Sequence, residues 1–171
     1  MLYFCFVEIL APKYSTEVIR GTQNARNIAH QVKRAIIESK PQAELIAYNF
    51  KGKNPLMSCF NVWNYCRTQI KYNKESANLQ TAKTLSRILS DKKNGYSYGD
   101  CKHYTIFCSS ILRALGIKTY LRLISQNFYN AEPTHIYCVA VINNKEVIVD
   151  GCMRNFDNEA QYKYKYNLKI K

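Results

Sequence analysis

The chain has 171 residues, which is enough for one domain with its own hydrophobic core. Its hydrophobic content of 47% and charged content of 22% exclude an intrinsically disordered chain. Its net charge of +13 leaves room for an acidic partner, including a nucleic acid, or for high solubility alone.

The cysteines and the first ten residues indicate a compartment. Seven cysteines occur at irregular spacings without a CxxC pair, which argues against a zinc site and against a complete disulfide framework. We therefore expect a reducing, cytoplasmic compartment, with no metal and no cofactor. The opening MLYFCFVEIL contains Glu8 and has no basic segment before it, so we interpret residues 2–10 as a strand rather than a signal peptide. No run reaches the roughly 18 apolar residues of a membrane span.

The next ninety residues contain mostly helical patterns. Apolar residues at helical spacing predict a helix over 24–38, which ends before Pro41. A loop is expected from Lys51 to Pro55. Two further helices are then expected, over 56–71 and over 80–90. The turn-rich residues 91–99 are expected to form a connector.

The second half begins with a helix signal at Asp100. This residue is a good N-cap for a helix over 101–115, which has an apolar face and stops at Gly116. A strand is expected at 118–124. Strands at 134–142 and 145–150 flank Asn143-Asn144, and a two-residue Asn loop between apolar runs predicts a β-hairpin.

The last ten residues alternate between tyrosine or aliphatic side chains and polar ones, mainly lysine. This alternation indicates a half-buried strand. One interpretation is an edge strand whose lysines prevent edge-to-edge aggregation. The other is a strand that binds phosphate or another acidic surface.

The candidate chemistry centres on Cys101, the first residue of the helix over 101–115. A helix N-terminus favours a thiolate, and its free N–H groups can hold an oxyanion. Of the three histidines, His30 lies off the apolar stripe of its helix and His103 points away from Cys101 around the helix. His135 is therefore the candidate base. If Ile142 pairs with Lys145 in the hairpin, Asp150 is a diagonal neighbour of His135 on the same face and can orient its ring.

Several motifs now resemble the transglutaminase-like superfamily. They are Gly99-Asp100-Cys101, the Leu-Gly-Ile at 115–117, the Thr-His-Ile-Tyr at 134–137 and the Val-Asp-Gly at 149–151. The resemblance covers 56–152 and implies an α+β, papain-like fold in which a nucleophile helix packs on an antiparallel sheet. It implies that Cys101 is the nucleophile, His135 the base and acid, and Asp150 the orienting carboxylate. Residues 1–55 then form an N-terminal layer on this core, and 153–171 form a C-terminal strand or tail.

The resemblance also bears on partners and leaves alternatives open. The sequence GDCKHYTIFCSSILRALGI is similar to small forms encoded by bacteriophages, which makes virion components possible partners. The expected function is hydrolysis of a peptide, isopeptide or side-chain amide. The alternatives are a non-catalytic or virion-associated module that kept the fold, and a basic nucleic-acid-binding protein. Many family members carry an acidic residue where this chain has His103. The residue that stabilises the oxyanion could be Trp63 or Gln80.

Overall fold

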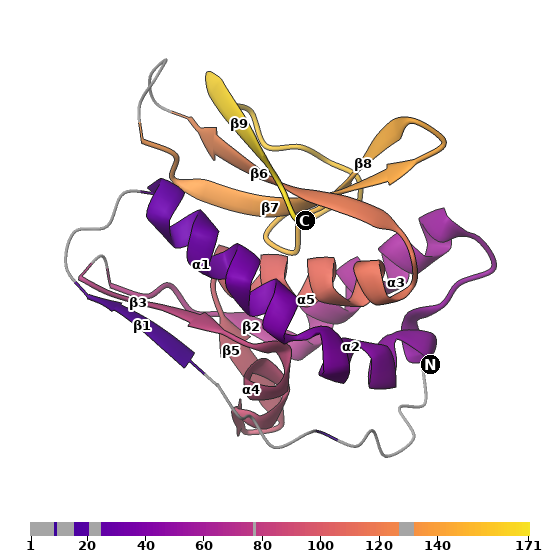
Figure 1. The fold of residues 1–171 in the computed structure, drawn as a ribbon, viewed down its shortest axis with the longest axis horizontal. Coiled ribbons are helices and arrows are strands. Elements are labelled where there is room, and N and C mark those ends of the chain that lie inside the picture. The colour runs from indigo at the N-terminus through magenta and orange to yellow at the C-terminus, as the bar shows by residue number, and fades with distance from the viewer. Residues whose placement is uncertain (1–8, 10–15, 21–24, 77, 127–131) are drawn as a thin grey trace.

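A central helix, α5 (Cys101–Ala114), organises the structure. The structure is a computed structural model that describes residues 9, 16–20, 25–76, 78–126 and 132–171. One side of α5 packs on a four-stranded antiparallel sheet, and α1, α2 and α3 pack on its other sides (Figure 1). Because α5 is covered on all sides, its residues 102–112 are all buried, including the polar ones. The fold is thus the expected mixed α+β arrangement, in which a buried helix packs on an antiparallel sheet.

The four-stranded sheet has the order β8-β7-β6-β9. Its strands are β6 (Lys118–Ser125), β7 (His135–Ile142), β8 (Lys145–Val149) and β9 (Tyr164–Lys169). Ile142 pairs with Lys145, as the hairpin interpretation predicted. Asn143 and Asn144 have φ angles of 51° and 62°, which is the left-handed conformation that both positions of a type I′ turn require.

The outer face of this sheet is covered by the chain that follows β8. Arg122 on β6 is 1% exposed, and its guanidinium bonds to Glu146 of β8 and to Glu159. Tyr137 on β7 also donates to Glu159. A small apolar cluster lies beside these contacts, so both faces of the sheet are packed.

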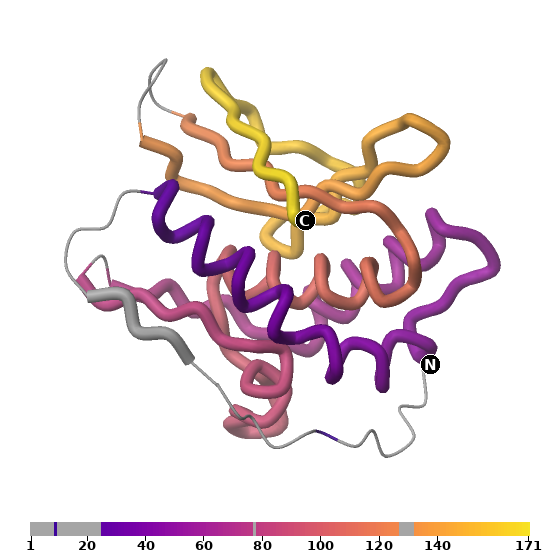
Figure 2. Tube along the Cα trace, viewed as in Figure 1, coloured from indigo at the N-terminus to yellow at the C-terminus, as the bar shows by residue number. Residues whose placement is uncertain are grey.

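The N-terminal half supplies helices on the other side of α5. The helices are α1 (Ala25–Glu38), α2 (Lys40–Ile46), the short 3₁₀ helix η1 (Ala47–Phe50) and α3 (Pro55–Gln69). The trace in Figure 2 shows α1 and α2 following one another along the same side of the molecule. α1 and α3 agree with prediction, but α2 was missed. Pro41 follows the end of α1, as predicted, but it also lies in the first turn of α2, a position that proline fits well.

The segment between α3 and α5 differs most from expectation. The predicted helix over 80–90 is wrong in its first half. Residues Leu79–Lys83 form β3, which pairs antiparallel with β1 (Thr16–Arg20), and only Leu85–Ser90 form a helix, α4. Pairing with a distant strand overrides the local helical pattern.

The connector over 91–99 is also more regular than predicted. Strands β4 (Lys92–Lys93) and β5 (Tyr96–Gly99) form a hairpin around Asn94-Gly95, and both turn residues have positive φ. β5 also pairs in parallel with β2 (Ile70–Tyr72). This pairing brings the end of β2 beside the residues that lead into α5. The strand predicted over 2–10 lies outside the described residues apart from Ile9.

Candidate active site

Cys101 lies at the first position of α5, where the helix is capped by Asp100. The Asp100 carboxylate accepts the backbone N–H groups of Lys102 and His103, and the Asp100 carbonyl accepts that of Tyr104. The N–H of Cys101 itself has no partner among the described residues. The helix start therefore presents a thiol and an unpaired donor side by side, at the positive end of the helix dipole.

His135 and Asp150 meet at the end of the β7–β8 hairpin. The His135 Nε2 and Asp150 Oδ2 atoms are 2.7 Å apart. The other Asp150 oxygen accepts the N–H of Cys152 at 2.9 Å. This arrangement fixes the carboxylate and leaves the Nδ1 edge of the imidazole for a second partner.

The second group that acts on His135 is Cys101, which contributes to the pKa of the imidazole. Burial alone would lower the pKa of His135. The hydrogen bond to Asp150 and the neighbouring Cys101 outweigh burial and raise this pKa to about 10. The structure thus brings together the three residues that the sequence singled out.

The loop that carries Asp150 is packed tightly against the helices. Trp63 of α3 donates its indole N–H to the Asp150 carbonyl at 3.1 Å. A Cβ atom on Gly151 would lie 2.6 Å from the Tyr104 ring and 3.0 Å from Cys66. Only glycine lets this turn approach α5 and α3 so closely, and the approach places the carboxylate beneath the imidazole.

Cys101 and His135 both open onto one cavity of about 130 Å³. Its walls come from α1, β2, β3, the start of α5 and the start of β7. The lining is mixed. Besides Cys101 and His135, its polar residues are Tyr72, Lys74, Glu75, Gln80, Asp100, Lys102 and Thr134. A substrate carbonyl that enters this cavity reaches the thiol and the imidazole together.

A buried ionic network lies under the start of α5. Lys102 is 3% exposed, and its ammonium contacts Asp100, Glu75 and the Gln80 amide oxygen. His103 is fully buried, with Nδ1 3.0 Å from an Asp100 oxygen and Nε2 3.2 Å from the Thr81 hydroxyl. His103 is therefore off the catalytic face, as expected, and helps to hold the N-cap. The sequence does contain a signal for this network. Lys102 follows Cys101 on a helix that is apolar enough to be buried, and a buried lysine requires a carboxylate partner.

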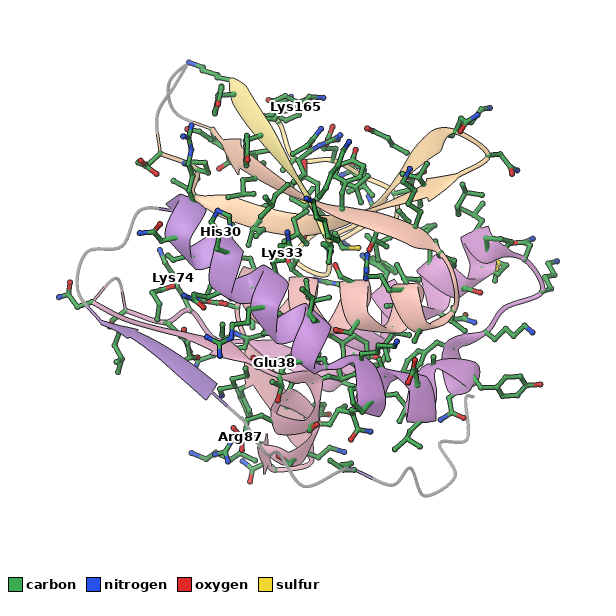
Figure 3. The ribbon with its side chains drawn as sticks, viewed as in Figure 1. His30, Lys33, Glu38, Lys74, Arg87 and Lys165 are labelled. Atoms are coloured by element: carbon green, nitrogen blue, oxygen red, sulfur yellow. The ribbon has the colours of Figure 1, made fainter. Side chains whose placement is uncertain are left out.

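Both sequence candidates for the oxyanion donor have other partners. Trp63 donates its indole N–H to the Asp150 carbonyl, so this donor is already occupied in the structure. Gln80 does line the cavity, but its amide nitrogen donates to the Ser76 carbonyl at 2.5 Å, and its oxygen accepts from Lys102. His30 is exposed on α1 (Figure 3) and does not line the cavity.

The other described cysteines lie in a different environment. Cys108 and Cys138 are fully buried, and burial raises the pKa of both thiols well above the usual range. The Cys66 and Cys108 sulfurs are 3.5 Å apart and share a hydrogen bond rather than a disulfide. Burial, followed by the charges of Asp150 and Cys101, also raises the pKa of Cys152. The thiols of Cys108, Cys138 and Cys152 are therefore poor nucleophiles.

One group within the described chain has ligand atoms suited to a metal ion. His135, Asp150 and Cys152 present such atoms within 4.8 Å of one another. However, His135 and the Cys152 N–H already take one Asp150 oxygen each, and the high pKa keeps the Cys152 thiol protonated. We therefore assign the group to orientation of the imidazole.

The family follows from a comparison with known sequences. The profile of the family described as "Transglutaminase-like domain" matches residues 42–170. The chain belongs to this family. The match extends on both sides of the 56–152 stretch in which the motifs lie. None of the curated proteins matches the chain in sequence.

Two solved structures have a similar fold. One is a candidate protease from Parabacteroides distasonis, with a TM-score of 0.55 and 11% identity over 74% of this chain and 26% of that one. The other is a candidate cysteine protease from Cytophaga hutchinsonii, with a TM-score of 0.49 and 14% identity over 80% of this chain and 48% of that one. The chain thus spans about a quarter of the first and about half of the second. The phage resemblance stays a prediction. Within the described residues, none of the helices has the length and apolarity to cross a membrane.

Proposed function

We propose that this transglutaminase-like chain is a cysteine hydrolase of peptide, isopeptide or side-chain amide bonds. Cys101 is the nucleophile, His135 the general base and acid, and Asp150 the orienting carboxylate. The observation that carries the proposal is the imidazole of His135, held between the Asp150 carboxylate and a thiol at a helix N-terminus. Such a thiol has the two features that activate a cysteine, a positive helix end and an imidazole partner.

The chemistry follows from these positions. The Cys101 sulfur attacks the amide carbonyl, and the thiol proton resides on His135. The negative charge on the carbonyl oxygen develops near the unpaired Cys101 N–H. His135 then gives its proton to the leaving amine, and a thioester to Cys101 remains. Water, activated by His135, hydrolyses the thioester and restores the thiol.

Brief treatment with iodoacetamide followed by peptide mass spectrometry tests the proposal. Cys101 is expected to be alkylated first, because the pKa of Cys108, Cys138 and Cys152 is raised. A His135→Gln change should slow Cys101 alkylation near neutral pH by about tenfold or more, because the imidazole no longer accepts the thiol proton.

The matched control is His30→Gln, which removes an exposed histidine from α1 and should leave the alkylation rate unchanged. Equal alkylation of several cysteines, or an equal effect of the two histidine changes, would count against an activated Cys101. Release of new amino groups from a peptide mixture by the wild type, and not by Cys101→Ala, would establish hydrolysis.

A further inference from the structure

Tyr72 lies at the end of β2, and the pairing of β2 with β5 brings it next to Cys101. Tyr72 pairs with Gly99, two residues before the thiol, and the N–H of Asn73 donates to the Gly99 carbonyl at 2.8 Å. A Cβ atom on Gly99 would lie 2.5 Å from the Cβ of His103. The close packing of Gly99 on α5 therefore fixes the distance between β2 and the start of the helix.

The Tyr72 ring is also held by α5 itself. Its edge packs on Tyr104, with the ring centroids 6.1 Å apart and an interplanar angle of 76°. Tyr104 lies one turn after Cys101 and is anchored by its own hydroxyl, which donates to the Ile70 carbonyl at 2.7 Å. Tyr72 is thus positioned over the helix face that carries the thiol, although 54% of the residue is exposed.

The hydroxyl of Tyr72 is free to bind a ligand. Tyr72 lines the cavity shared by Cys101 and His135. Its hydroxyl has no hydrogen-bond partner among the described residues. Burial, followed by the neighbouring Cys101, Cys152, Asp100 and Asp150, raises the pKa of Tyr72 to about 12, so the phenol keeps its proton while negative charge develops nearby.

We infer that the Tyr72 hydroxyl is a catalytic oxyanion donor that acts together with the Cys101 N–H. Both are unpaired donors beside the thiol, whereas Trp63 and Gln80 already bind other groups. A donor that is held in place before the reaction stabilises the charge on the attacked carbonyl oxygen without first reorganising. The inference rests on the proposed function and adds a residue to it.

Two reagents separate oxyanion stabilisation from thiol activation. With p-nitrophenyl acetate, the Cys101 sulfur bonds to the ester carbonyl carbon and an oxyanion forms. The C–O bond then breaks, p-nitrophenolate leaves with the electron pair, and water hydrolyses the acetyl thioester to acetate. With iodoacetamide, the sulfur displaces iodide from a saturated carbon, and no oxyanion forms. A loss of the oxyanion donor therefore slows only the first reaction.

The decisive variant is Tyr72→Phe, which keeps the ring and its contact with Tyr104. We expect its acylation rate to fall by about tenfold or more, with an unchanged rate of alkylation at Cys101. Tyr48→Phe is the matched control, because Tyr48 is 78% exposed on η1, and both rates should equal those of the wild type. The unchanged alkylation rate also reports that Tyr72→Phe is folded.

Three results would overturn the inference. The first is an unchanged acylation rate in Tyr72→Phe. The second is an equal fall in both rates, which would assign Tyr72 to the thiol rather than the oxyanion. The third is a selective acylation defect in Gln80→Ala but not in Tyr72→Phe. A wild-type protein that is not acylated at Cys101 would instead overturn the proposed function itself.

Discussion

His135 is a buried imidazole whose charge depends on its neighbours. Only 17% of its side chain is exposed, so burial disfavours the charged form. Asp150 and Cys101 reverse this effect and raise the pKa from 6.5 to about 10. A histidine that is held protonated in this way carries the proton for a leaving amine at neutral pH. An ordinary histidine is protonated in only a minority of molecules at that pH.

The raised pKa of His135 predicts how stability depends on pH. The folded protein holds this proton more tightly than the unfolded chain, so the contribution is fully present below about pH 6.5. It is lost as the pH rises towards about 10. The measurement belongs in a Cys101→Ser background, where the thiol does not titrate and Asp150 still raises the pKa. There the free energy of unfolding in urea should fall above about pH 6.5, by at most about 1.4 kcal/mol per pH unit.

The comparison variant is Cys101→Ser with His135→Gln, which lacks the titrating ring and should not show this decline. The two variants should therefore differ most at low pH and converge as the pH rises. A difference that stayed constant, or grew with pH, would mean that the folded protein does not hold the proton on His135.

At the scale of the element, the start of α5 depends on one carboxylate with two tasks. Asp100 caps the helix and also neutralises the buried ammonium of Lys102. Burial alone would raise the pKa of Asp100, but hydrogen bonds from His103 and the charge of Lys102 lower it to about 2. The depressed pKa means that this stabilisation is present above about pH 4 and is lost as the pH falls towards 2.

A pair of substitutions separates the two tasks of Asp100. Asp100→Asn keeps a good N-cap and removes the charge, so Lys102 remains buried with only Glu75 as an anionic partner. We expect a loss of about 2–4 kcal/mol in the free energy of unfolding, measured with urea at neutral pH. Adding Lys102→Met should restore part of this loss, because the unpaired charge is then removed as well.

The result depends on the coupling between the two positions. The two side chains do not act as a buried pair if Asp100→Asn leaves the free energy of unfolding unchanged. The same conclusion follows if the losses of free energy caused by Asp100→Asn and Lys102→Met are simply additive in the double variant. Reduced alkylation of Cys101 in Asp100→Asn would further show that the cap affects the reactivity of the thiol.

The elements that were predictable from the sequence are those with local signals. Asp100 and Gly116 bound α5, and Asn143-Asn144 sets the hairpin register that brings His135 to Asp150. The Cys–His–Asp grouping followed from these two elements alone. Their catalytic roles remain proposals.

The remaining elements depend on distant pairing, which leaves little mark on the local sequence. β3 exists because β1 pairs with it, and the parallel pairing of β2 with β5 joins segments separated by α4. Tyr72 reaches the cavity only through that parallel pairing. No periodicity in the sequence indicates Tyr72 as an oxyanion donor. From the sequence, Trp63 and Gln80 are the candidates for that role.

The whole molecule combines a high positive charge with an open sheet edge. The C-terminal strand β9 pairs only with β6, so its other edge is unpaired within the described part of the chain. Lys165 and Lys169 of β9, and Lys163 directly before it, are exposed, and Figure 3 shows Lys165 on β9, at the side of the sheet away from α5. The predicted edge strand is therefore present. Binding of an acidic partner or a nucleic acid by this surface stays a prediction.

The edge position of β9 predicts a specific role for its lysines. An unpaired strand edge offers backbone N–H and C=O groups to a second molecule, and lysines along the edge oppose that pairing through charge repulsion. Replacement of Lys163, Lys165 and Lys169 by Gln should increase concentration-dependent light scattering, with little change in Tm, because these exposed side chains contribute little to folding.

Lys40, Lys51 and Lys53 are exposed lysines outside the sheet, and their replacement by Gln removes the same charge. If this control scatters as much light as the β9 variant, net charge alone maintains solubility. If instead the β9 variant scatters no more than the wild type but binds DNA less tightly, with a shallower salt dependence, the lysines act as a binding surface.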